Sequence, residues 1–220
     1  MTDDQQLDVH SFTVAPELTG ICRPAVAWLE GARVVERDPR LDVKLAEVES
    51  ALRQHPPADT ASVRTMYKRI GLDPTKTRPS SEALLRRVRK GDTLPRINSL
   101  VDVCNWCSVE FQLPYGLYDA AQIDGDITLR LGTEGESYPG IRKDDVHVAG
   151  RMTLADGRGP FGNPTSDSAR TMVTTATERA IVVVFGPGDT AADRLRSVLD
   201  QTVARMADIT GCRETGRWLG

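Results

Sequence analysis

A line of polar side chains crosses an otherwise apolar helix predicted at residues 94–112, and these side chains are well placed to do chemistry. Asn98, Asp102 and Asn105 stand at positions i, i+4 and i+7, which places them along one side of a helix. Buried amide and carboxylate groups need hydrogen-bond partners, and each one left without a partner costs roughly 1–3 kcal/mol. The line therefore indicates either tethers to neighbouring loops or the polar wall of a pocket, and both interpretations remain open.

The rest of this helix is apolar on nearly every side, which is typical of a helix at the centre of a core. Cys104 and Cys107 lie within it at the Cys-x-x-Cys spacing of redox proteins. A thiolate is favoured at a helix N-terminus rather than inside an apolar helix, so core packing is the better interpretation of this pair.

Other common catalytic arrangements are missing from the sequence. The three histidines, at positions 10, 55 and 147, lie in unrelated contexts, and no Ser-His-Asp or Cys-His arrangement accompanies them. A zinc site would need several such ligands close together. The Gly- and Pro-rich loop predicted at residues 155–168 lacks the Gly-Lys-Ser/Thr element of a phosphate-binding loop. We expect neither a metal nor a cofactor.

A second group of polar residues comes shortly before an apolar strand predicted at residues 180–185. Asp167, Ser168 and Arg170 provide hydrogen-bond donors and acceptors there. Polar residues at the mouth of a core strand often line a binding site. The alternative is an exposed surface crossing without a function.

The charge of the chain is uneven. Its net charge is −3, but the segment from Arg64 to Arg96 contains ten Lys/Arg and three acids, a local balance of +7. Such a patch on an acidic protein fits a phosphate-bearing partner, although a solvated helix face would look the same. The candidate phosphate contacts are Lys76, Arg78, Arg86, Arg87, Arg89 and Lys90.

Hydrophobic periodicity favours an α+β fold, because helices mostly come first and strands mostly follow. Helices are predicted at residues 41–54, 60–70, 80–90 (with Ser80 as N-cap), 94–112 and from a cap at Asp189 or Thr190 through Met206. Strands are predicted at residues 11–14, 25–29, 127–131, 146–154 and 180–185. With no repeat or linker, we expect one compact domain whose central helices pack on a mixed or antiparallel sheet.

Within this domain we expect an N-terminal α/β extension at residues 11–70, a core at 71–186 and a C-terminal helix at 189–210. Residues 1–10 are acidic and polar, unlike a signal peptide, and are expected to be disordered. No apolar run approaches the roughly 20 residues of a membrane span, so the sequence predicts a cytoplasmic protein without membrane contact.

Several of these residues also form motifs of a known family. Ile-Asn-Ser-Leu-Val-Asp-Val-Cys-Asn at residues 97–105, followed by Leu-Pro-Tyr-Gly-Leu-Tyr-Asp at 113–119, resembles a signature of the B3/4 domain. This domain is the editing module of the beta subunit of bacterial phenylalanyl-tRNA synthetase. The chain from residue 11 to 186 is more similar still to free-standing B3/4 domain proteins. These share its Lys-x-Arg-Pro-Ser pattern from Lys76 and its Arg-Thr-x-x-Thr-x-x-Thr pattern from Arg170.

The resemblance implies a pocket between the central helix and the sheet. It also implies hydrolysis of the ester that joins a wrong amino acid to tRNA, as the synthetase module does with tyrosyl-tRNA. Such an ester is already activated, so a positioned water and hydrogen bonds to the developing oxyanion can suffice without a nucleophilic side chain. The resemblance assigns no catalytic residue to this chain.

Carried over by position, Asn105 is the pocket Asn and Asp102 its neighbour, while Cys104 replaces the usual Thr. Gly116 replaces a His, and the strand position of a pocket Glu falls near Val183. The tyrosine specificity of the synthetase is therefore not expected here. Candidates for the substituted pocket contacts are Tyr115, Asp167, Ser168 and Arg170.

Three hypotheses follow for the function. The first is a trans-editing aminoacyl-tRNA deacylase, with tRNA and an aminoacyl group as partners. The second is a non-catalytic module that binds an amino acid, a derivative of one, or RNA; the absent His and Glu motivate it. The third is hydrolysis of another small acyl compound in the same pocket. The sequence predicts no oligomeric state.

Overall fold

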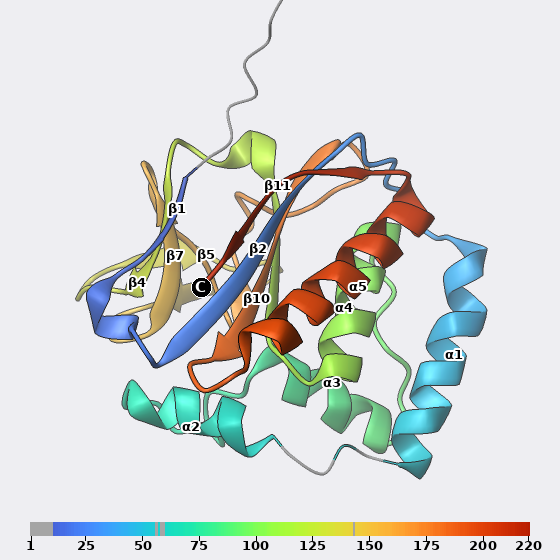
Figure 1. Cartoon of the computed structure of the whole chain (residues 1–220), viewed down its shortest axis with the longest axis horizontal. Coiled ribbons are helices and arrows are strands. Elements are labelled where there is room, and N and C mark those ends of the chain that lie inside the picture. Colours follow the sequence, from blue (N-terminus) through green and yellow to red (C-terminus); the bar gives the residue numbers. More distant parts are fainter. Residues whose placement is uncertain (1–10, 56, 58–59, 143) are drawn as a thin grey trace, which may run out of the picture.

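Two β-sheets lie face to face, and helices cover the outer face of one of them (Figure 1). The computed structural model describes residues 11–55, 57, 60–142 and 144–220, so the predicted disorder of residues 1–10 lies outside the described residues. The helices are α1 (Pro39–Gln54), α2 (Ala61–Arg69), α3 (Ser80–Arg89), α4 (Ser99–Phe111) and α5 (Ala192–Thr210), with short 3-10 turns at Pro16–Leu18 and Ala120–Gln122. The strands are β1 (Phe12–Val14), β2 (Cys22–Glu30), β3 (Tyr115–Asp119), β4 (Ile127–Leu131), β5 (Ser137–Pro139), β6 (Asp145–His147), β7 (Met152–Asp156), β8 (Gly159–Asn163), β9 (Ser166–Asp167), β10 (Arg179–Pro187) and β11 (Arg213–Leu219).

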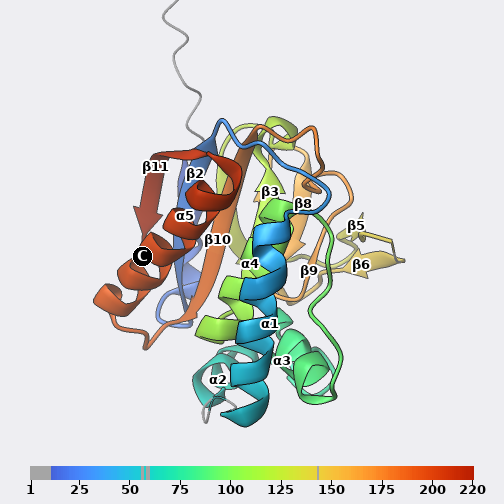
Figure 2. The same cartoon turned by 90° about the vertical axis from the view of Figure 1, so that its right-hand side faces the viewer.

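The first sheet has the strand order β11-β2-β10-β3 and is antiparallel throughout. Residues 180–185 of β10 are fully buried, which matches the wholly apolar strand predicted there. Helices α4 and α5 pack against this sheet, and α1 lies outside α4 (Figures 1 and 2). The central helix of the prediction is therefore α4, which lies between α1 and the sheet.

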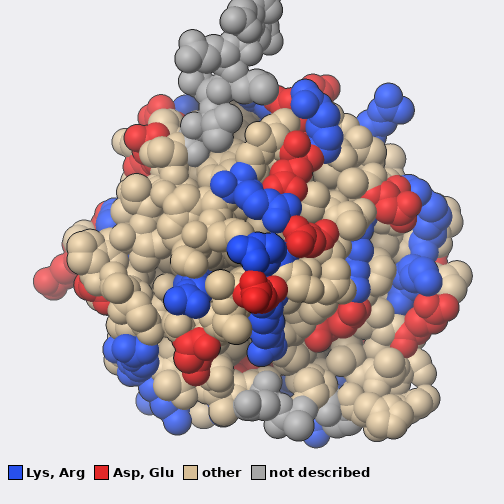
Figure 3. All heavy atoms as spheres, in the orientation of Figure 1, with Lys and Arg blue, Asp and Glu red and all other residues tan. Residues whose placement is uncertain are grey.

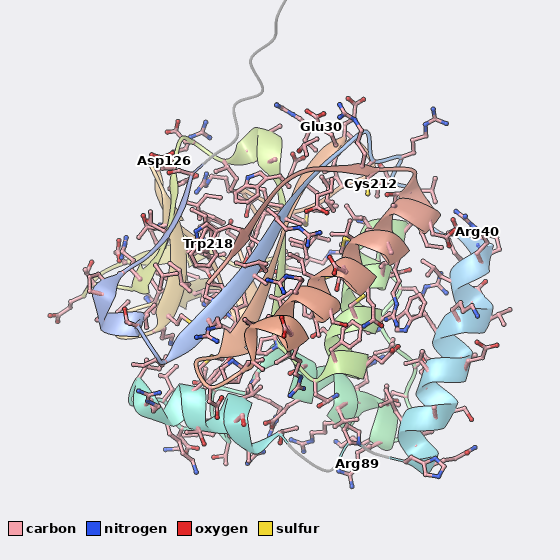
Figure 4. All side chains as sticks on the ribbon, in the orientation of Figure 1. Glu30, Arg40, Arg89, Asp126, Cys212 and Trp218 are labelled. Atoms are coloured by element: carbon pink, nitrogen blue, oxygen red, sulfur yellow. The ribbon has the colours of Figure 1, made fainter. Side chains whose placement is uncertain are left out.

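The second sheet has the order β1-β4-β7-β8-β9 and is mixed, because β1 pairs parallel with β4. Aromatic contacts join it to the first sheet. Phe12 packs on Trp218 and Tyr118 packs on Phe161, each with ring centroids 5.0 Å apart; Trp218 is labelled in Figure 4. The expected α+β class, a single domain with helices on mixed and antiparallel sheets, is confirmed.

The start of the central helix differs from the prediction. Helix α4 begins at Ser99 rather than near residue 94, because Asn98 is its N-cap. The Asn98 backbone is extended, and its side-chain oxygen accepts a hydrogen bond from the Val101 amide at 3.0 Å. A capping Asn followed by apolar periodicity signals the start of a helix. The prediction placed the start too early because apolar residues also precede Asn98.

Two predicted helix caps are also corrected. Pro79, not Ser80, precedes α3 as its cap residue, and the Ser80 hydroxyl makes no capping bond. Ala191 precedes α5 without a side-chain cap, so neither Asp189 nor Thr190 caps that helix.

The strand predictions missed several features, and strands β3 and β5 are among those that were not predicted. The predicted strand 146–154 is divided between β6 and β7, because Gly150 turns the chain at a φ of 66°. The predicted loop 155–168 contains β8 and β9, joined to β7 by a tight hairpin. Strand β11 was not predicted and closes the first sheet beside β2.

A buried ion pair fixes the position of α4. Asp102 is fully buried, and its carboxylate accepts hydrogen bonds from Arg96 Nε at 2.6 Å and from the Ile97 amide at 2.8 Å. Arg96 also binds the carboxylate of Asp42 on α1 and donates to the Asp38 carbonyl. One guanidinium thus links α4, the segment that precedes it, and α1.

Replacing Asp102 by Asn should destabilise the fold, because Arg96 would remain in its partly buried position without the more deeply buried of its two carboxylate partners. We expect a loss of about 3 kcal/mol in the free energy of unfolding, measured by urea titration. The control is Asp193→Asn, whose side chain is 93% exposed and should change stability by less than about 0.5 kcal/mol. Equal effects for the two variants would contradict the anchoring role.

Candidate functional site

A cavity of about 370 Å³ lies between α3, α4 and strand β3 at the edge of the first sheet. It lies between the central helix and the sheet, where the resemblance implied a pocket. Its apolar lining consists of Leu84, Ile97, Val101, Cys104, Tyr115, Leu117, Ile141, Met172 and Val173. Its polar lining consists of Ser80, Asn105, Ser108, Arg142 and Asp167. A mostly apolar concavity with a few polar groups is the usual form of a small-molecule site.

Exposed apolar side chains mark this cavity as more than a packing defect. Ile97 is 46% exposed and Met172 is 37% exposed, and both belong to its lining. They are two of the four large hydrophobic residues exposed in the described part of the chain. Exposed apolar surface around a concavity is typical of a surface that meets a ligand.

Ser80 supplies a hydroxyl that the protein itself does not satisfy. Its Oγ is buried and has no hydrogen-bond partner among the described residues, while its backbone amide donates to the Pro164 carbonyl. A buried hydroxyl without a partner costs about 1–3 kcal/mol, so its persistence in a cavity wall needs a reason. The sequence predicted Ser80 only as a helix cap, because a Ser before a helix indicates a cap.

The polar line of α4 divides into two parts. Asn98 caps the helix and also donates from Nδ2 to the Val173 carbonyl at 3.2 Å, so both ends of its amide tether backbone. Asp102 is held by Arg96 and does not line the cavity. Asn105, one turn further along, is partly exposed and lines the cavity. Of the three, Asn105 is the residue available to a ligand.

Tyr115 and Ser108 shape the wall without offering their hydroxyls to a ligand. The Tyr115 hydroxyl lies 2.8 Å from the Thr202 hydroxyl of α5, and Ser108 donates to the Leu113 carbonyl at 2.8 Å. Burial raises the pKa of Tyr115 well above its usual value, so its phenol stays protonated. The ring of Tyr115 is therefore the part that faces the cavity.

The cysteines of the Cys-x-x-Cys pair are both free thiols. Burial raises the pKa of Cys104 well above its usual value and that of Cys107 to about 11. Neither forms appreciable thiolate at neutral pH, which agrees with a packing role and makes Cys104 an apolar lining residue rather than a nucleophile.

The two departures from the family signature lie next to each other. Gly116 of β3 stands directly opposite Val183 of β10, and directly opposed residues point to the same face of an antiparallel sheet. A Cβ at Gly116 would overlap the ring of Tyr118, which lies between Gly116 and Gly162 of β8. Gly116 and Val183, where the resemblance led us to expect a His and a Glu, therefore face the second sheet, and Tyr118 occupies the space beside Gly116.

Tyr118 connects this packed face to the cavity. Its hydroxyl donates to Asp167 Oδ1 at 2.7 Å, and Asp167 lines the cavity from β9. Burial, and then the neighbouring Asp167, raise the pKa of Tyr118 well above its usual value, so the phenol is the donor of this bond.

The remaining predicted contacts lie outside the cavity wall. The Ser168 hydroxyl pairs with that of Thr171 at 3.0 Å. Arg170 binds the Asp156 carboxylate through two bonds of 2.8 and 2.9 Å and lines a separate surface groove. The structure therefore brings together Asn105, Cys104, Tyr115 and Asp167, and leaves Asp102, Gly116, Ser168 and Arg170 outside.

A second concavity of about 600 Å³ lies on another face of α3 and is strongly basic. Arg64 is paired there with Glu82 through bonds of 2.8 and 2.9 Å. The other cations in its described lining are Arg78, Arg86, Arg89 and Lys90. Lys76 and Arg87 lie outside it, and Arg87 donates to the Thr93 carbonyl. Arg89 is labelled at the lower end of the molecule in Figure 4. The face of the molecule seen in Figure 3 carries a mixture of positive and negative side chains.

No other site chemistry stands out in the described part of the chain. No group of three His, Cys, Asp or Glu residues within it is arranged to hold a metal ion. None of its helices combines the length and the apolar character that crossing a membrane requires.

The fold and the cavity define an α+β domain with a small-molecule-sized site between a central helix and a sheet. Its fold is similar to a crystallised N-terminal fragment of the phenylalanyl-tRNA synthetase beta-subunit from Pyrococcus horikoshii, with a TM-score of 0.51. That similarity covers 94% of this chain and 50% of the fragment at 15% identity, so it concerns the fold alone.

A sequence model of the B3/4 domain matches residues 62–211, and the chain therefore belongs to the B3/4 domain family. It is 32% identical over 90 residues to the phenylalanine–tRNA ligase beta subunit of Paramagnetospirillum magneticum, covering 35% of this chain. It is 30% identical over 86 residues to that of Brucella abortus, covering 39% of this chain. Each match spans 11% of the ligase subunit.

The division of the polar line can be tested with two alanine variants. Asn98→Ala should lower the free energy of unfolding by about 1–2 kcal/mol through the lost cap, and it should leave ligand handling per folded molecule unchanged. Asn105→Ala should have the opposite profile, near-native stability with impaired ligand handling. Thermal melts and the hydrolysis assay described below measure the two effects. Impairment by Asn98→Ala at full folding would contradict the division.

Proposed function

We propose that this chain is an aminoacyl-tRNA deacylase that acts in trans, hydrolysing the ester of mischarged tRNA in the cavity between α4 and the sheet. The observation that carries the proposal is the Ser80 hydroxyl, which has no hydrogen-bond partner among the described residues and belongs to a residue in the wall of an apolar cavity of a B3/4 domain. Family membership and the likeness to synthetase beta subunits support a tRNA-related module. A tRNA substrate also implies a cytoplasmic location.

The reaction needs little from the protein beyond positioning. The amino-acid side chain would lie against the apolar lining, which includes Val101, Leu117 and Val173. Water attacks the ester carbonyl, a new C–O bond forms, the ester C–O bond breaks, and the ribose hydroxyl leaves with a proton. The Asn105 amide and the Ser80 hydroxyl are the donors for the oxygen on which negative charge develops. No nucleophilic side chain takes part, in agreement with the protonated thiol of Cys104.

The basic groove beside α3 is the proposed binding site for the tRNA backbone. Arg86 and Arg89 face that groove, while Leu84 of the same helix faces the cavity. The two concavities are thus separated by α3, and a helix with its side chains is about 10–12 Å across. We propose that phosphates next to the acceptor end contact the groove while the terminal aminoacyl group enters the cavity.

A second candidate function is binding of an amino acid or aminoacyl group without turnover. It is favoured by Gly116 and Val183, which stand where the family signature has His and Glu. The two functions differ in one observable, the release of product. A ligand stabilises a binding module but is not hydrolysed by it.

The deacylase function can be tested with a panel of tRNAs charged with different amino acids. Added protein should accelerate release of the amino acid from at least one mischarged tRNA by tenfold or more over spontaneous hydrolysis. Unchanged hydrolysis across the panel, together with a thermal shift by an amino acid or a tRNA, would establish the binding function instead.

The role of Ser80 can be tested against its neighbour. Ser80→Ala removes an unsatisfied hydroxyl, so stability should stay level or rise slightly, whereas hydrolysis should fall by about 10²-fold. Ser81 is a matched control, since its hydroxyl is also buried, has no partner in the described part of the chain, and does not line the cavity. Ser81→Ala should leave hydrolysis unchanged. A similar loss in both variants would remove Ser80 from the mechanism.

The groove makes a separate prediction about salt. Arg86→Ala and Arg89→Ala should each weaken tRNA binding and reduce the slope of log affinity against log salt by about 1. Exposed Arg194 on α5 is the control, and Arg194→Ala should change neither quantity. Filter binding between 50 and 200 mM salt measures both. Identical slopes for the α3 and α5 variants would place tRNA elsewhere.

A further inference from the structure

Two exposed apolar side chains lie where the candidate cavity opens to solvent. Ile97, in the segment before α4, and Met172, in the loop between β9 and β10, are both exposed and both line the cavity. An exposed lining residue lies at the mouth, because the interior of a cavity is closed to solvent. We call these two side chains the apolar rim. Apolar surface around a concavity marks a place where a ligand is met, so the rim indicates a ligand that continues beyond the cavity with a further apolar group.

The backbone on both sides of the apolar rim is held in place. The side chain of Asn98, next to Ile97, donates to the carbonyl of Val173, next to Met172, at 3.2 Å. This buried bond joins segments 75 positions apart in the sequence. The amide of Ile97 itself donates to the buried Asp102 carboxylate at 2.8 Å. The two exposed side chains are therefore brought together by fixed backbone, and a ligand that binds them pays little for ordering the rim.

The size of the cavity indicates which part of the ligand meets the apolar rim. Its volume of about 370 Å³ is near the lower end of the range of roughly 300–1,000 Å³ found for small-molecule sites, which suits one aminoacyl group. Under the proposed function the ester carbonyl lies at Ser80 and Asn105, and the ester joins the aminoacyl group directly to the sugar of the terminal nucleotide. The sugar and its base then remain at the mouth. A nucleobase has a flat π-face, which an apolar surface can cover.

Building on the proposed function, we propose that Ile97 and Met172 bind the terminal nucleobase of the tRNA by packing against its face. Methionine suits this role, because its flexible thioether adapts to its partner and makes favourable contacts with aromatic rings. Packing of this kind recognises that a base is present and does not read its edge. The ligand of the site is then an aminoacyl nucleoside, and an amino acid without the nucleoside binds more weakly because it leaves the rim uncovered.

Calorimetry with two non-hydrolysable compounds tests this inference without requiring turnover. One is 3′-leucylamino-3′-deoxyadenosine, and the other is the same compound with hydrogen in place of adenine. The wild-type protein should bind the first at least tenfold more tightly than the second. Ile97→Ser and Met172→Ser should each reduce that preference threefold or more and leave the affinity for the base-free compound unchanged. Met172→Leu, which keeps an apolar side chain, should retain the preference.

The control removes an exposed apolar side chain away from the cavity. Val43 on α1 is 63% exposed and does not line the cavity, so Val43→Ser should alter neither affinity. Equal affinities of the wild type for the two compounds, or no binding of either at 10 mM, would overturn the inference, as would a preference that both rim variants retain in full. Sedimentation of the wild type as a dimer that Ile97→Ser dissociates would assign the apolar rim to a second copy of the chain and would also overturn it.

Failure of this inference is distinguishable from failure of the deacylase function. A preference for the compound with adenine, without hydrolysis of any charged tRNA, would keep the nucleobase site and remove the enzyme. Hydrolysis of a mischarged tRNA at the wild-type rate by both Ile97→Ser and Met172→Ser, with equal affinities for the two compounds, would keep the enzyme and overturn the nucleobase site.

Discussion

The buried ion pair between Asp102 and Arg96 is the interaction on which the arrangement of the site depends. Asp102 is fully buried in α4, and Arg96 connects it to α1 through Asp42. Removing one member of such a pair leaves the other as an uncompensated charge, which is far more costly than losing a surface salt bridge. The pair, together with the Asn98 cap, fixes the rotation of α4, and that rotation directs Asn105 toward the cavity.

A second constraint lies on the opposite face of β3. Alternation along the strand directs Tyr115 and Leu117 to the cavity and Gly116 and Tyr118 to the second sheet. The large ring of Tyr118 fits because glycines lie on both sides of it. The same strand thus builds an apolar wall on one face and supports the Asp167 carboxylate from the other.

Much of the fold could be predicted from the sequence, because its signals are local. Periodicity indicated all five helices of the described chain and the buried strand β10. Strand β8, Gly-Pro-Phe-Gly-Asn, was missed because glycine and proline are unusual in strands. Gly162 is accommodated there because the ring of Tyr118, from the other sheet, packs directly against it. Strand β11 was missed because its alternation is weak and its pairing with β2 joins residues about 190 positions apart.

Part of the cavity lining could be predicted from the sequence for the same reason. Asn105 and Cys104 follow from the helix and its signature, and Asp167 from its place before a core strand. Ser80 could not be found, since a buried hydroxyl without a partner is a property of the packed structure. Asp102 and Arg170 are the converse case, because a polar residue that is satisfied by an arginine or aspartate of the same chain has the same sequence signature as a ligand contact.

The most direct test of the account is a crystal structure with a non-hydrolysable analogue of the charged tRNA end, 3′-leucylamino-3′-deoxyadenosine. The leucyl side chain should lie between α4 and β3, with the amide carbonyl oxygen within hydrogen-bond distance of Ser80 Oγ or Asn105 Nδ2. An analogue bound only in the basic groove beside α3, with the cavity unoccupied, would contradict it.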